Sequence, residues 1–161
     1  MWFLDMKEMM SPVNFVQKLI AEKLRNEPWF SAHDVRIVEQ NSQDLQFLLR
    51  TKLDELKFVS LVVGVDSIRN DHTGLEVQFT VTCSERVTLN RAKQGFATAI
   101  DAACAAVQVL DCSDEGGVEQ VWHFEDLRHE SIRETDMLRA TATFGGIVNR
   151  LFIDGINKEE V

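Results

Sequence analysis

Residues 75–84 read LEVQFTVTCS, and apolar and polar side chains alternate over all ten positions. This period of two is typical of a strand that has one face on a core and the other facing water. The predicted core face consists of Leu75, Val77, Phe79, Val81 and Cys83. The predicted outer face consists of Glu76, Gln78, Thr80, Thr82 and Ser84. This strand is the clearest structural signal in the sequence, and the rest of the fold is predicted outward from it.

The segment before this strand is predicted to be its hairpin partner. Residues 58–65, FVSLVVGV, are almost continuously apolar, which is typical of a strand covered on both faces. Residues 69–74, RNDHTG, are rich in residues that favour turns. We therefore predict two strands joined by a polar six-residue loop.

An alanine-rich segment follows the hairpin. Residues 88–110, TLNRAKQGFATAIDAACAAVQVL, predict one helix from about Leu89 to Leu110. We expect it to pack on the apolar face of residues 75–83. Its expected contact stripe, at intervals of four and three residues, consists of Phe96, Ile100, Ala103, Val107 and Leu110. We expect Cys104 and Cys83 to be small buried core residues.

The segments before the hairpin predict a helix, a strand and a second helix. Ser11 followed by Pro12 is typical of a helix start, and this helix is expected to end near Asn26. Residues 35–38 predict a short strand. Residues 42–56 then predict a helix with a stripe of leucines.

The segments after the alanine-rich helix predict two more strands, at residues 118–125 and 138–144. Gly145 and Gly146 are expected to mark a bulge or the end of regular pairing. The predicted order is α-β-α-β-β-α-β-β. It indicates an α+β fold in which a mixed or antiparallel sheet of four to five strands packs with two to three helices. We expect a flexible N-terminal tail at residues 1–10 and one domain over residues 11–161.

Composition limits the classes of function. The chain has 161 residues and a formal charge of −9, which argues against a protein that grips nucleic-acid phosphates. Residues 111–136 hold nine acidic residues against two arginines. This span is interpreted as a solvated acidic edge, or alternatively as a surface that meets a basic partner or faces passing DNA. Three cysteines without paired spacing indicate a reducing setting, and no stretch is long enough to span a membrane.

The search for catalytic and metal-binding patterns is negative. The sequence has no phosphate-binding glycine motif, no His-Glu-x-x-His and no nucleophile-elbow motif. His33 is expected in a loop or at a helix cap. His123 and His129 flank acidic residues, but their spacing matches no known ligand set. We therefore expect no enzyme activity, no cofactor and no metal site.

The order of elements resembles the tail-terminator and tail-completion proteins of tailed phages, the group that includes minor tail protein U. The resemblance covers residues 13–150. It rests on the hairpin, on residues 85–91 (ERVTLNR) leading into an alanine-rich helix, and on the final strand LRATATF at residues 138–144.

The resemblance implies a structural protein of a phage or prophage virion. It implies a homo-oligomeric ring, commonly a hexamer, that ends the tail tube and joins it to the head connector. The implied partners are copies of this chain, the tail tube protein and the head-tail connector, with no specific binding of nucleic acid or membrane. The implied location is the host cytoplasm during assembly and then the virion tail.

The expected contacts with a neighbouring subunit or ring come from the hairpin loop and from an apolar cluster at residues 151–153, LFI. The candidates are Arg69, Asn70, Asp71, His72, Thr73 and Phe152. An alternative function of another class stays open: a small-molecule-binding or regulatory α/β sandwich with a ligand between sheet and helices.

Overall fold

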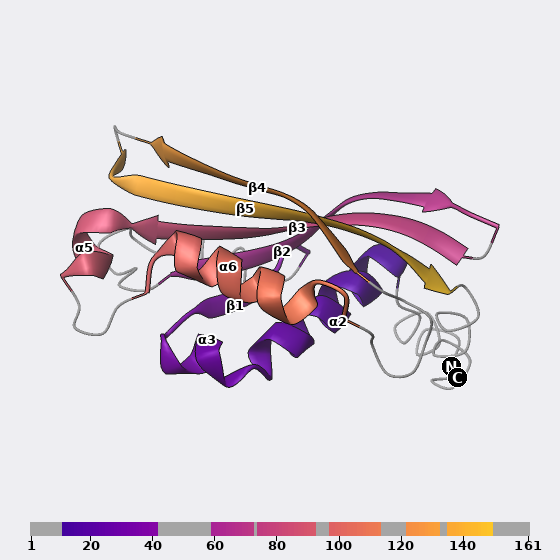
Figure 1. Ribbon diagram of the computed structural model, residues 1–161, viewed down its shortest axis with the longest axis horizontal. Coiled ribbons are helices and arrows are strands. Elements are labelled where there is room, and N and C mark those ends of the chain that lie inside the picture. The colour runs from indigo at the N-terminus through magenta and orange to yellow at the C-terminus, as the bar shows by residue number, and fades with distance from the viewer. Residues whose placement is uncertain are drawn as a thin grey trace, which may run out of the picture.

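A computed structural model describes residues 11–41, 59–72, 74–92, 97–113, 122–132 and 135–149. These residues form a single α+β domain around a five-stranded sheet, as predicted. The strand order is β1-β2-β3-β5-β4 (Figure 1). The strands are β1 (Arg36–Glu39), β2 (Ser60–Asn70), β3 (Gly74–Arg86), β4 (His123–Ile132) and β5 (Met137–Asn149).

The sheet is mixed, because β1 runs parallel to β2 whereas all other neighbouring strands pair antiparallel. The alternating sequence forms β3, in the middle of the sheet. Val77, Phe79, Val81 and Cys83 are fully buried, so the predicted core face is confirmed there. The opposite face, which we call the polar sheet face, carries polar pairs of β3 and β5 such as Thr80 opposite Thr143.

Two long helices, α2 (Pro12–Arg25) and α6 (Ala99–Leu110), pack on the apolar face of the sheet. α2 lies on β1 and β2, and α6 lies on β3, β5 and β4. Two helices of five residues, α3 (Pro28–Ala32) and α5 (Val87–Arg91), follow α2 and β3. In Figure 1, α2, α3 and α6 lie on the same side of the sheet. The predicted packing of the alanine-rich helix on β3 is thus confirmed.

The described part of the alanine-rich segment contains two helices, so the prediction of one helix from Leu89 to Leu110 is wrong. α5 ends at Arg91, and α6 begins after the N-cap residue Thr98. The Thr98 hydroxyl accepts a hydrogen bond from the backbone N–H of Asp101 at 3.0 Å, and the Asp101 carboxylate accepts one from the backbone N–H of Thr98 at 3.0 Å. This reciprocal capping box is a local signal for a new helix start.

The side of α6 that faces the sheet consists mainly of alanines. Its fully buried residues are Ala99, Ala102, Ala103, Ala106 and Leu110. The predicted stripe is therefore confirmed at Ala103 and Leu110, whereas Ile100 and Val107 are only partly buried and lie at the margin of the contact. The helix is rotated from the predicted orientation, and its small residues face inward. Phe96, the remaining member of that stripe, lies outside the described residues.

The sheet supplies the bulk that the helix lacks. Phe79 and Phe144 stack with their ring centroids 4.9 Å apart, and Trp122 meets Phe79 edge-on at 5.0 Å. All three rings are fully buried. Because interiors pack to nearly constant density, large rings on the sheet require small side chains on the helix above them. This packing answers why the helix is so rich in alanine.

Cys104 corrects a further prediction, because it is exposed. It lies on the outer side of α6, away from the alanines that contact the sheet. Cys83, in contrast, is buried on β3 as predicted.

Several strand boundaries differ from the predicted ones. β2 continues to Asn70, and β4 begins at His123 and runs to Ile132, later than the predicted strand at residues 118–125. β5 continues through Gly145 and Gly146 to Asn149, so the glycines do not end the pairing. The irregularity lies in β4, between Phe124 and Asp126.

Two of the glycines in the sheet, Gly64 and Gly145, lie under polar side chains. A Cβ atom at Gly145 would meet the carboxylate of Glu125, and one at Gly64 would lie 2.8 Å from Oε1 of Gln40. Glycine at these positions therefore makes room for a side chain that lies over the strand. β2 is also less covered than predicted, since Val62 is partly exposed whereas Leu61 and Val63 are buried. The predicted tail at residues 1–10 and the predicted helix at residues 42–56 lie outside the described residues.

Candidate functional site

The end of the β2–β3 hairpin holds four of the predicted contact residues. Arg69 and Asn70 belong to β2, where they pair with Glu76 and Leu75. The predicted six-residue loop is therefore wrong, because only residues 71–73 separate the two strands. Backbone hydrogen bonds between Asp71 and Gly74 close this connection, at 2.9 and 3.3 Å.

The hairpin end presents a short polar surface. Arg69, Asn70 and His72 are exposed, and Asp71 is half-buried. In Figure 1 this end of the sheet lies at the right, on the opposite side from α5. The structure thus brings these four residues together at one extremity of the sheet. Thr73 and Phe152, the other predicted contact residues, lie outside the described residues.

The polar sheet face carries a second group of charged residues, along β4. Asp126, Arg128 and Glu130 pair with Thr143, Thr141 and Arg139 of β5. Arg128 Nε lies 2.7 Å from Asp126 Oδ2, and Arg139 Nη1 lies 3.4 Å from Glu130 Oε1. These groups line a hollow of about 670 Å³ on the sheet surface. Acidic and basic side chains therefore alternate along this part of the polar sheet face.

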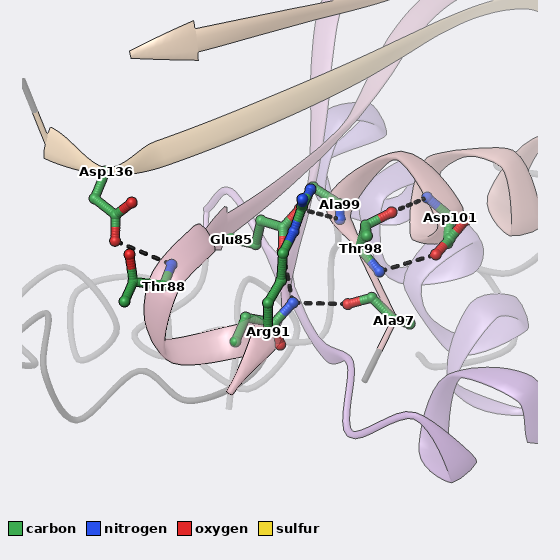
Figure 2. Close-up of polar contacts among 9 residues, drawn as sticks. Glu85, Thr88, Arg91, Ala97, Thr98, Ala99, Asp101 and Asp136 are labelled. Atoms are coloured by element: carbon green, nitrogen blue, oxygen red, sulfur yellow. Dashed lines mark hydrogen bonds and ion pairs between the residues drawn. The ribbon is translucent and has the colours of Figure 1, made fainter. Parts of the chain in front are cut away.

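A buried carboxylate that sequence reasoning missed lies at the junction of β3, α5 and α6 (Figure 2). The Glu85 side chain is fully buried. Its Oε2 accepts a hydrogen bond from Asn90 Nδ2 at 2.6 Å, and its Oε1 accepts one from the backbone N–H of Ala99 at 3.1 Å. Arg91 Nη2 lies 3.7 Å from Oε1. We call this group, with the Ala97 carbonyl that Asn90 also binds at 2.8 Å, the polar junction.

The polar junction has a positioning role. Glu85 bonds to the first backbone N–H of α6, where the helix dipole favours negative charge. Asn90 is also buried and bridges Glu85 to the chain that enters α6. The alternation of apolar and polar residues ends at Ser84. Position 85 continues the buried side of β3, so a glutamate at this position was the sequence signal for a buried carboxylate. Residues 85–91, which carry part of the phage resemblance, supply the side chains of this junction, and residues 97 and 99 supply its backbone groups.

The turn between β4 and β5 is fastened to the same end of the sheet. Asp136 adopts a positive φ of 55°, and its carbonyl accepts a hydrogen bond from the Val87 backbone N–H at 2.9 Å. Its carboxylate accepts another from the Thr88 backbone N–H at 3.1 Å (Figure 2). These bonds cap α5, so α5 and the β4–β5 turn are held together.

A second hollow, of about 430 Å³, lies between α3 and the outer side of α6. Trp29 and His33 stack along it with centroids 4.4 Å apart, and Glu27, Asp101 and Cys104 also line it. His33 caps the C-terminus of α3, and its Nδ1 donates to the Trp29 carbonyl at 2.8 Å. The loop or capping role predicted for His33 is confirmed. This hollow opens on the outer side of α6 and not between α6 and the sheet.

The remaining histidines do not form a site in the described residues. His123 and His129 are exposed residues of β4, and His72 is exposed at the hairpin end. Among the residues that the structure describes, no group of three or more His, Cys, Asp or Glu side chains could hold a metal ion. No helix within the described ranges is long and apolar enough to cross a membrane.

The three cysteines differ in environment, and this difference predicts their reactivity. Burial raises the pKa of the Cys83 thiol. Because the thiolate is the reactive form, we expect a thiol reagent at neutral pH to modify Cys104 and Cys112 but not Cys83 in the folded protein. Thiol titration should count two groups before denaturation and all three afterwards. Rapid labelling of Cys83 in the native protein would contradict its placement.

Comparison with known proteins adds one finding about the fold. The sequence matches no protein-family model and no curated protein sequence. Among solved structures, the chain is similar to a chain from the virion of a native gene transfer agent particle, with a TM-score of 0.55 and 20% identity. The match covers 83% of this chain and 93% of that chain. The two chains thus share a fold over nearly the whole length of the virion chain.

Proposed function

We propose that this protein is a structural component of a phage-like virion, and that it forms a ring at the end of the tail tube. The observation that carries the proposal is the fold shared with a chain of a gene transfer agent virion over 93% of that chain. The order of elements in residues 13–150, which resembles that of tail-terminator and tail-completion proteins, supports the same proposal.

The surfaces of the domain agree with an assembly role. The helices cover one face of the sheet, and the other face presents polar and charged side chains of β3, β5 and β4. The hairpin end projects at one extremity of the sheet (Figure 1). A net charge of −9 would keep DNA from adhering to the wall of a ring. In a head-to-tail ring, each subunit would use two different surfaces, and closure would leave no free contact.

Native mass spectrometry of the full chain tests the ring. We expect one discrete closed oligomer, with six subunits as the expected number. Electron microscopy of the same sample should show rings. A strict monomer at every concentration, together with a thermal shift on addition of small metabolites, would instead support the small-molecule-binding alternative.

Addition of the protein to a polymerising tail tube protein tests its position in the tail. We expect shorter tubes with the ring at one end. The Arg69→Glu variant should still form the ring but bind the tube less well, if the hairpin end meets the tube. A matched control is Glu76→Lys, which changes the charge of the cross-strand partner of Arg69. Equal tube binding by the wild type and Arg69→Glu would remove the hairpin end from the contact.

A further inference from the structure

β4 is an edge strand of the sheet, and this edge is long. β4 has ten residues and pairs with β5 on one side. No strand that the structure describes pairs with its other side, and in the left half of Figure 1 the arrowhead half of β4 is the uppermost strand of the sheet. Residues 128–131 are all exposed. Such an edge presents unpaired backbone N–H and C=O groups to which another strand can add.

The first part of this edge is already blocked. The Phe124 backbone N–H donates to the Asp111 carboxylate at 2.8 Å. The irregularity between Phe124 and Asp126 further disturbs the strand there. From Asp126 to Ile132 the pairing with β5 is regular, so this part of β4 retains an undistorted edge.

The charges on the regular part of β4 have a specific order. Asp126, Arg128 and Glu130 lie on the polar sheet face, since their β5 partners Thr143, Thr141 and Arg139 lie on it. Proteins often protect edge strands with charged side chains, especially lysines, which disfavour the addition of another strand. Because the charges of β4 follow the order acid, base, acid, two copies of the strand can be aligned so that opposite charges face each other.

We propose that two copies of the chain pair through this edge, antiparallel and about a two-fold axis at His129. In this register Arg128 of each copy lies opposite Glu130 of the other, which makes two opposite-charge pairs. Moving the axis to Arg128 would place arginine opposite arginine and Asp126 opposite Glu130, which is unfavourable throughout. Moving it to Leu127 would bring the irregular residue Glu125 into the pairing. The charge order and the irregularity together therefore select the register at His129.

This contact is isologous, because each copy contributes the same strand. It differs from the head-to-tail contact of the proposed ring, which joins two different surfaces. The test of the β4 contact therefore does not depend on whether the ring forms.

A disulfide trap at the two-fold axis tests the pairing. His129→Cys, in a background with Cys104→Ser and Cys112→Ser, places one thiol beside its own copy, since directly opposed residues have Cα atoms about 4.5–5.5 Å apart. We expect mild oxidation to give a covalent dimer on a non-reducing gel. The matched control Glu76→Cys, also exposed but on β3, should stay monomeric on the same gel.

Charge reversal then tests the register. Arg128→Glu in the His129→Cys background should reduce the rate of dimer formation about tenfold, because the introduced glutamate of each copy then faces Glu130 of the other. Arg128→Glu combined with Glu130→Arg should restore the rate, while Arg69→Glu should leave it unchanged. Absence of dimer from His129→Cys would overturn the pairing. A dimer that forms regardless of Arg128→Glu, or that the double reversal fails to restore, would overturn the register.

Discussion

The Glu85→Ala variant is expected to lose about 3 kcal/mol of unfolding free energy, because it leaves the buried Ala99 N–H and one N–H of Asn90 Nδ2 without an acceptor. For a domain of this size the loss corresponds to a fall of about 6–12 °C in the thermal midpoint. Differential scanning calorimetry and chemical denaturation should both detect it. Circular dichroism of the folded variant should keep its strand signal, because the sheet core does not include Glu85.

The Glu85→Gln variant separates hydrogen bonding from volume. Glutamine has nearly the same shape, but one of its oxygens becomes an N–H₂ group that faces donors. Asn90 cannot simply reverse its amide, because its Nδ2 also donates to the Ala97 carbonyl. We therefore expect Glu85→Gln to cost about 1–2 kcal/mol, less than Glu85→Ala. Glu76→Ala, an exposed glutamate on the same strand, should change stability by less than about 0.5 kcal/mol. If Glu85→Ala were as stable as Glu76→Ala, the polar junction would have no positioning role.

The sheet could be predicted in detail where one face of a strand is buried and the other faces solvent. Residues 75–84 alternate, and this pattern predicted the two faces of β3. The apolar run at residues 58–65 and the turn residues at 69–74 predicted its partner in the hairpin. The length of the loop at the end of the hairpin was predicted less accurately. The turn residues Asn70 and Gly74 are compatible with either a wide loop or a short one, and the pairing of Asn70 with Leu75 decides between them.

The candidate site was predictable only in part, because its residues come from patterns of different kinds. The hairpin residues are consecutive in sequence, so their content of turn-forming residues was enough to predict their position. The alternation of β3 places position 85 on the buried side, but nothing local to Glu85 shows which groups would satisfy a carboxylate there. Its burial results from α6, whose first N–H group lies fourteen residues later in the chain. The alternating charges of β4 were visible in the sequence, but their position on a sheet edge depends on the strand order.

The orientation of α6 is where sequence reasoning was wrong and where the consequence for stability is largest. A periodicity argument assigns the largest apolar residues of a helix to its buried side. Here the buried side is alanine, because Phe79, Phe144 and Trp122 of the sheet region already fill the interface. The two orientations predict opposite effects for substitutions on α6.

Ala102→Leu is therefore expected to destabilise the fold by about 3 kcal/mol, since the added atoms have no space between helix and sheet. Cys104→Leu makes a similar change two residues later on the exposed side of the same helix, and it should change the unfolding free energy by less than about 0.5 kcal/mol. Chemical denaturation of both variants measures the difference directly. In the orientation through Ile100 and Val107 that the sequence predicted, Ala102 would lie off the contact stripe, and Ala102→Leu would be nearly neutral. A neutral Ala102→Leu would therefore contradict the alanine interface, whereas a large loss confined to Ala102→Leu shows that the small side chains of α6 set its distance from the sheet.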